Sequence, residues 1–165
     1  MLARPLLLGA LLLTTLVAQA EIITGRVVGV ADGDTVTVLD QSNTQHKIRL
    51  AGIDAPEKAQ AFGQRSKESL SDLLFDKTVT VDTDKRDRYG RQVGKILVDG
   101  TDANLVQIER GLAWHYKAYA HEQPVQDRET YAAAEVAARG HRRGLWRDAE
   151  PVAPWEFRRR GKQAQ

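Results

Sequence analysis

The sequence predicts an α+β fold in which five short strands form a small Greek-key barrel and about three helices pack on it. Residues 21–50 are rich in Val, Ile and Thr and are interrupted by turn-forming residues, which is typical of strands. Helical spacing follows over residues 63–76. Strand character returns over residues 78–84 and 90–98, so the strands number five.

The first three strands are expected at IITGRVVGV, TVTVLD and HKIRL. Apolar residues alternate there with Thr, Lys and Arg, and side chains alternate between the two faces of a strand. The alternation places Val36, Val38, Ile48 and Leu50 in the core. Arg49 is expected on the opposite, exposed face.

The remaining elements are expected to be mostly helical. Leu70, Leu73 and Leu74 share one face of the first helix. Asp102 is suited to cap a second helix that Gly111 closes, and a third helix is expected from about 124 to 139. A helix between the third and fourth strands indicates a barrel of the oligonucleotide-binding (OB) type, although a five-stranded sandwich fits the same pattern.

Three segments of different composition divide the chain. Residues 1–20 combine an early Arg with a leucine-rich centre and a final Ala-Gln-Ala, which predicts a signal peptide and an exported protein, periplasmic or extracellular. An uncleaved membrane anchor is the alternative. Residues 21–148 suit one domain, which contains no cysteine and therefore neither disulfides nor thiolate metal sites. Residues 149–165 form a Pro- and Arg-rich basic tail that we expect to be extended or disordered.

Carboxylates cluster at two expected strand ends. Asp32 and Asp34 flank Gly33 in one turn, and Asp54 and Glu57 follow the third strand. Turn formation and capping alone account for such residues, and the spacing does not fit an EF-hand loop. If the two ends meet, however, the carboxylates repel one another unless a cation lies between them. Asp34 and Asp54 are then candidate ligands of a hard cation, Ca²⁺ or Mg²⁺.

Arginines accompany these carboxylates. Arg49 precedes Asp54 on the third strand, and the stretch RDRYGRQ contributes further guanidinium groups at the turn into the fifth strand. The planar guanidinium matches phosphate oxygens better than an ammonium does. Surface ion pairs are the plainer interpretation of each arginine taken alone.

Four motifs in order carry a resemblance to a known family: DGDTV, RLAGIDAPE, DRYGR and ERGLAWHY, at residues 32–36, 49–57, 87–91 and 109–116. Together they resemble the staphylococcal-nuclease-like family of thermonucleases, over about residues 25–146. The resemblance implies that Asp34, Asp54 and the backbone carbonyl of Ala55 bind Ca²⁺, with Mg²⁺ as the alternative. Family members often have Thr where this chain has Ala55, which leaves a carbonyl ligand intact.

The resemblance also implies the catalytic residues and the substrate. Glu57 would activate water, and Arg49 and Arg91 would hold the phosphate. Tyr89, Tyr119 and Arg88 are candidate substrate-binding residues. Lys117 stands where some relatives have another tyrosine.

The expected activity is hydrolysis of DNA and RNA, with unpaired strands preferred, little sequence specificity and 3′-phosphate products. We expect a monomer with no stable protein partner, and no membrane association unless the leader is retained. We expect His115 to be structural and Trp114 to lie in the core. Two other functions stay open: an OB-type module that binds single strands without cleaving them, and a glycosidase that uses Asp54 and Glu57.

Overall fold

The barrel of this protein is made by five long strands. The structure, a computed structural model, describes residues 21–163. The long strands are β1 (Glu21–Asp32), β2 (Thr35–Asp40), β3 (Gln45–Leu50), β5 (Thr78–Arg86) and β6 (Gln92–Val98). Three two-residue strands, which the sequence did not predict, are β4 (Ile53–Asp54), β7 (Thr101–Asp102) and β8 (Trp114–His115).

The strand pairing closes the sheet on itself. Its order is β3-β2-β1-β5-β6-β7, and a parallel pairing of β3 with β6 joins the two sides. The closed sheet confirms the OB-type α+β barrel and shows that the sandwich alternative is wrong. The predicted core positions Val36, Val38, Ile48 and Leu50 are all buried.

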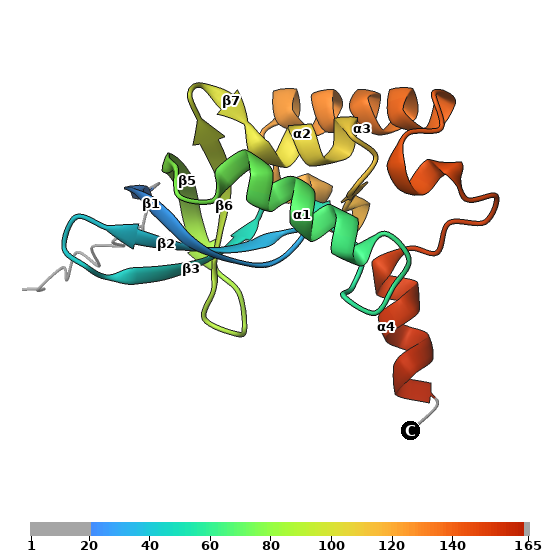
Figure 1. The fold of residues 1–165 in the computed structure, drawn as a ribbon. Helices are drawn as coiled ribbons and strands as arrows, with labels where there is room; N and C mark the ends of the chain where they lie inside the picture. Colours follow the sequence, from blue (N-terminus) through green and yellow to red (C-terminus); the bar gives the residue numbers. More distant parts are fainter. Residues whose placement is uncertain (1–20, 164–165) are drawn as a thin grey trace, which may run out of the picture.

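The helices cover one side and one end of the barrel (Figure 1). They are α1 (Gly63–Leu74), α2 (Ala103–Glu109), α3 (Val125–Gly140) and α4 (Pro154–Gln163), with 3-10 turns η1 (Lys117–Glu122) and η2 (Gly144–Arg147). Asp102 caps α2 as predicted, since its side chain accepts a hydrogen bond from the Leu105 N–H. Gly140, expected just beyond the third helix, is its last residue.

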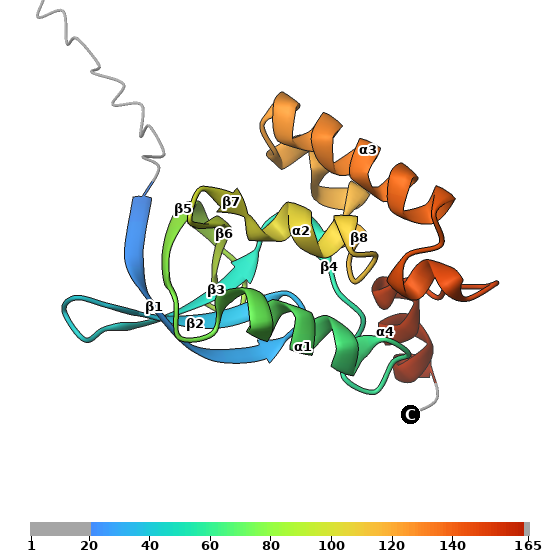
Figure 2. The same cartoon turned by 45° about the horizontal axis from the view of Figure 1, so that its top comes forward.

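The C-terminal tail is folded, so the prediction of an extended or disordered tail is wrong. Pro154 begins α4, which lies beside the first turn of α1 in both views (Figures 1 and 2). A second apolar cluster holds this region together. It contains Trp114, Ala138, Leu145, Trp146 and Ala153, with Phe62 and Trp155 packed against it.

The described residues contain no helix that is long and apolar enough to cross a membrane. The predicted signal peptide, residues 1–20, lies outside the described residues.

Candidate active site

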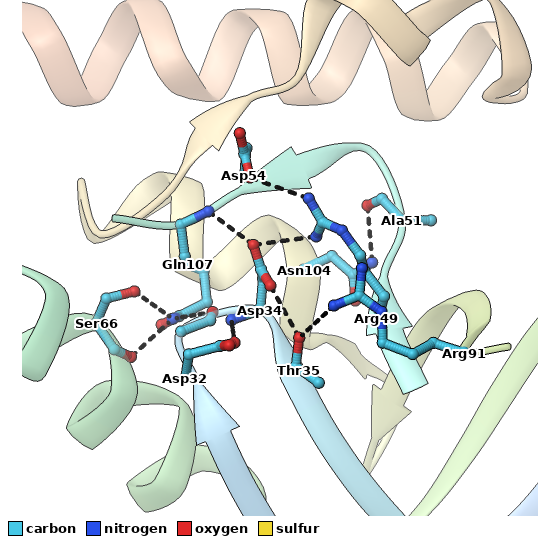
Figure 3. Close-up of polar contacts among 12 residues, drawn as sticks. Asp32, Asp34, Thr35, Arg49, Ala51, Asp54, Ser66, Arg91, Asn104 and Gln107 are labelled. Atoms are coloured by element: carbon cyan, nitrogen blue, oxygen red, sulfur yellow. Dashed lines mark hydrogen bonds and ion pairs between the residues drawn. The ribbon is translucent and has the colours of Figure 1, made fainter. Parts of the chain in front are cut away.

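Two turns at one end of the barrel bring Asp34 and Asp54 together. Asp34 lies in the turn between β1 and β2, and Asp54 ends β4. The Arg49 guanidinium lies between them: its Nη1 is 3.0 Å from Asp34 Oδ2 and its Nη2 is 3.0 Å from Asp54 Oδ1 (Figure 3). One guanidinium therefore spans two carboxylates that lie 20 positions apart in the sequence.

Arg49 is more buried than the strand alternation predicts. Its side chain is only 16% exposed, because the two carboxylate-bearing turns cover the outer face of β3. Arg49 Nη1 makes no hydrogen bond within residues 21–163 and is held beside Asp34 by the ion pair alone.

Local contacts fix the Asp34 carboxylate. Its Oδ2 accepts a hydrogen bond of 2.9 Å from the Ala55 N–H, and its Oδ1 accepts one of 3.1 Å from the Thr35 hydroxyl. Gly33 is required beside it, because an added Cβ would lie 1.8 Å from Ser66 Oγ. The turn can therefore pack directly on α1.

Two buried amides of α2 support both turns (Figure 3). Gln107 Nε2 donates to the Gly33 carbonyl at 2.9 Å. Asn104 Nδ2 donates to the carbonyls of Ala51 and Gly94 at 3.0 and 3.1 Å. Neither amide was predicted from the sequence, because amides within an amphipathic helix give no signal of the backbone groups that they meet.

Arg91 lies on the same side of the barrel. Its Nη1 is 3.4 Å from Thr35 Oγ1, and its Nε donates to Asp87 Oδ2 at 2.7 Å. Burial would raise the pKa of Asp87, but the hydrogen bonds from Arg91 outweigh it and the pKa is lowered. Through Thr35, Arg91 is joined to the Asp34 carboxylate.

Glu57 meets a residue that was not predicted to belong to the site. Arg158 of α4 donates to Glu57 Oε1 at 2.7 Å from Nη1 and to Asp54 Oδ2 at 2.8 Å from Nη2. A signal for the helix that carries Arg158 was present in the sequence. Pro154 stands at the first helical position, Glu156 lies in the first turn, and basic residues lie in the last turn.

Burial and the charge of Asp34 shift the pKa values of two carboxylates of the site. Burial raises the pKa of Asp54, and the charge of Asp34 adds to this effect, although hydrogen bonds from Arg158 oppose it. Burial also raises the pKa of Asp32, and Asp34 adds to it. Burial alone would lower the pKa of Arg49, but Asp34 and Asp54 raise it. The charged forms of Asp32 and Asp54 are therefore disfavoured by their surroundings.

The donor set fits a hard cation that keeps several water ligands. Within residues 21–163 no three His, Cys, Asp or Glu side chains form a metal-binding group. Asp34 and Asp54 supply two carboxylates. Ala55, the predicted carbonyl ligand, is buried beside them, and its N–H donates a hydrogen bond to the Asp34 carboxylate. Mg²⁺, and Ca²⁺ in open sites, accept such a mixture of carboxylates, carbonyls and water.

The predicted substrate-binding residues lie on the surface beside this site. Tyr89 is 69% exposed, and the guanidinium groups of Arg88 and Arg91 lie 4.9 and 5.5 Å from its ring centre. Tyr119 is exposed and its ring centre lies 4.9 Å from that of Tyr116. We call Tyr89, Arg88 and Tyr119 the rim; their role in binding stays a prediction.

The interior residues of the fourth motif are buried, which confirms the core position expected for Trp114. Trp114 is buried and meets the Trp146 ring edge-on at 4.5 Å. His115 is 2% exposed, and its Nε2 is 2.8 Å from Gln123 Oε1. Lys117 stands where some relatives have a tyrosine. Its ammonium group forms an ion pair of 2.6 Å with the buried Glu135.

Comparisons with known proteins show the family of this chain. A family model described as staphylococcal nuclease homologue matches residues 47–148. An uncharacterized endonuclease of Haemophilus influenzae is 42% identical over 165 residues, which cover 98% of this chain and 89% of the relative. An uncharacterized endonuclease of Escherichia coli O157:H7 is 45% identical over 82% of this chain and 85% of its own length. The micrococcal nuclease of Shigella flexneri is 39% identical over 85% of this chain and 83% of its own length. The chain belongs to the family of staphylococcal nuclease homologues.

Proposed function

We propose that this protein is an exported Ca²⁺-dependent nuclease that hydrolyses phosphodiester bonds of DNA and RNA and leaves 3′-phosphate ends. The observation that carries the proposal is the Arg49 bridge between Asp34 and Asp54. It joins candidate metal ligands to a candidate phosphate ligand, with Glu57 and Arg91 on the same side of the barrel. The endonucleases and the micrococcal nuclease among the relatives support the same chemistry.

The site contains the groups that phosphodiester hydrolysis needs. Glu57 takes a proton from water and orients it for in-line attack. Arg49 binds a phosphoryl oxygen, and Arg91 stabilises charge on the equatorial and leaving oxygens. Asp34 and Asp54 hold the metal ion, which supplies Lewis-acid polarisation of the phosphoryl oxygen when bound.

The exposed rim favours single strands and little sequence specificity. Tyr89 and Tyr119 offer ring faces on which any base can stack, and Arg88 adds a positive charge for the backbone. Contacts of this kind bind phosphates and bases without reading base edges. We propose that the protein acts as a monomer, without a stable protein partner.

Export rests on the predicted leader at residues 1–20 and not on the folded domain. Mass measurement of the protein recovered from the periplasm or the medium tests it. Loss of the first 20 residues is expected. A full-length chain retained in the membrane fraction would instead support the uncleaved anchor.

One assay tests the nuclease. The purified chain lacking residues 1–20 is incubated with single-stranded DNA or RNA in Ca²⁺, in Mg²⁺ or in chelator, and the product ends are identified. We expect cleavage with Ca²⁺, loss of cleavage in chelator, 3′-phosphate products and inactivity of Glu57→Ser. Strand binding without cleavage would favour the binding module, and cleavage of a glycoside that is indifferent to Ca²⁺ would favour the glycosidase.

A further inference from the structure

Arg158 occupies the carboxylates of the site from a part of the chain outside the four motifs. Asp54 Oδ2 accepts from Arg158 Nη2 at 2.8 Å, and Asp54 Oδ1 accepts from Arg158 Nη1 at 3.2 Å. The same Nη1 reaches Glu57 Oε1 at 2.7 Å. One guanidinium thus binds a candidate metal ligand and the candidate general base together.

This contact is built into the fold through the start of α4. Trp155 stacks on Tyr116 with ring centres 5.5 Å apart and planes 11° apart, and it meets Trp114 edge-on at 5.4 Å. Gln60 Nε2 donates to the Val152 carbonyl at 2.6 Å. Arg158 lies three residues after Trp155, hence on the same helix face. The aromatic anchor therefore aims the guanidinium at the carboxylates.

A divalent ion and Arg158 cannot both use Asp54 in this way. Ca²⁺ binds carboxylate oxygens at about 2.3 to 2.6 Å, whereas Arg158 Nη2 already lies 2.8 Å from Asp54 Oδ2. Asp54 Oδ1 is shared by Arg49 and Arg158. A divalent ion would be a third cationic centre beside this one carboxylate, and in a buried site both guanidinium groups would repel it.

Arg158 has room to withdraw. Its side chain is 40% exposed, whereas that of Asp54 is 1% exposed. An open pocket of about 380 Å³ adjoins it and is lined by Asp32, Glu57, Phe157, Arg158 and Gly161 among others. The guanidinium can leave Asp54 while the anchored first turn of α4 stays in place.

We propose that Arg158 is an internal counter-cation of the site, which neutralises Asp54 and Glu57 without metal and must leave Asp54 when Ca²⁺ binds. The last helix therefore sets the metal affinity of the enzyme. This inference rests on the proposed function, because it requires a divalent ion at Asp34 and Asp54. The two effects are linked. The free energy by which the Arg158 contact stabilises the metal-free state is lost from the free energy of Ca²⁺ binding.

The test measures Ca²⁺ binding by titration calorimetry, which needs no substrate and no catalysis. Arg158→Gln should lower the Kd for Ca²⁺ by about tenfold, within the usual range for coupled sites. The matched control is Arg159→Gln, which removes the same charge from an exposed neighbour on the same helix; its Kd should change by less than about twofold, because exposed charges are screened. Arg158→Lys should fall between them, since an ammonium cannot bridge two carboxylates as a guanidinium does.

Thermal melting gives a second readout and guards against misfolding. Without metal, Arg158→Gln should melt below wild type, because buried Asp54 loses one of its two arginine partners, and added Ca²⁺ should raise its Tm more than it raises that of wild type. If Arg158→Gln does not fold, Arg158→Lys tests the proposal, and its Kd for Ca²⁺ should likewise be lower than that of wild type.

The outcomes separate the two proposals. If wild type binds Ca²⁺ and Arg158→Gln binds it no more tightly than Arg159→Gln, the counter-cation role is wrong and the nuclease proposal stands. If no variant binds Ca²⁺ and cleavage is indifferent to chelator, both the metal-dependent function and this inference are overturned.

Discussion

The carboxylate end of the site and its rim are built in opposite ways. Asp34 and Asp54 are buried, and Arg49 between them is nearly so; hydrogen bonds from the backbone and from neighbouring side chains hold them. Tyr89 and Tyr119 are exposed, and their rings lie beside long, flexible cationic side chains or another ring. The groups that we propose to meet the reacting phosphate are therefore fixed before a substrate arrives, and the groups that we propose to meet the rest of the strand are left adaptable.

The largest expected effect comes from breaking the buried bridge. Arg49→Gln should lower the cleavage rate by about 10² to 10³, because a preorganised donor is lost. It should also lower the free energy of unfolding in chelator by about 3 to 5 kcal/mol, as expected when one partner of a buried ion pair is removed. Kinetics and denaturant unfolding check both. Lys47→Gln, exposed on the same strand, should match wild type in both; equal losses would show that β3 is sensitive to any substitution.

Arg91 offers a sharper comparison, because its partner Asp87 lies at a hairpin and not in the core. Arg91→Gln should lower the rate by about 10² but change the free energy of unfolding by less than about 1 kcal/mol. Rate measurements and chemical denaturation separate the two effects. Wild-type turnover would remove Arg91 from the proposed site. Arg26→Gln, which breaks a surface pair with Asp76, is the control for loss of charge.

Loss of a supporting amide should affect stability more than the cleavage rate. Asn104→Ala removes the donor to Ala51 and Gly94 and leaves buried carbonyls without it. We expect a loss of about 1 to 3 kcal/mol in the free energy of unfolding. The rate should fall by only about tenfold, because the reacting groups remain. Gln126→Ala on the exposed side of α3 should stay within about 0.5 kcal/mol of wild type; a rate loss as large as that of Arg91→Gln would place Asn104 closer to the chemistry.

The smallest effect is expected at the rim. Tyr89→Ala should raise KM for single-stranded DNA by about 5- to 10-fold, as for one lost stacking contact, with little change in kcat. Tyr89→Phe should behave as wild type, because the ring face is kept. Steady-state kinetics measure both, and a fall in kcat at constant KM would mean that Tyr89 acts at the reacting phosphate.

Local patterns were sufficient to place the strands and the two carboxylate turns along the chain. Alternation over Val36, Val38, Ile48 and Leu50 identified one buried face, and turn-forming glycine at position 33 located the strand end. These features are local, so a local pattern reveals them. The closing β3 and β6 pairing is not local, which is why a sandwich remained an alternative until the structure was known.

The site was predicted where the motifs are contiguous and missed where it depends on distant packing. Arg158 reaches Asp54 across 104 positions of sequence, and its basic, proline-containing segment resembles a solvated tail when its apolar partners are unknown. Trp155 was the signal that this segment packs on the domain, because its ring packs against the cluster around Trp114. Asn104 and Gln107 gave no clue, because the carbonyls they bind belong to other elements.

The position of α4 has a consequence for how the enzyme matures. Chains emerge from the ribosome with the N-terminal part first, and the barrel can close once β6 has been made, at residue 98. The two carboxylate turns and the α2 amides that support them are all made more than 50 residues before Arg158. Until α4 has been made, the site would therefore be at its most attractive to any free divalent ion.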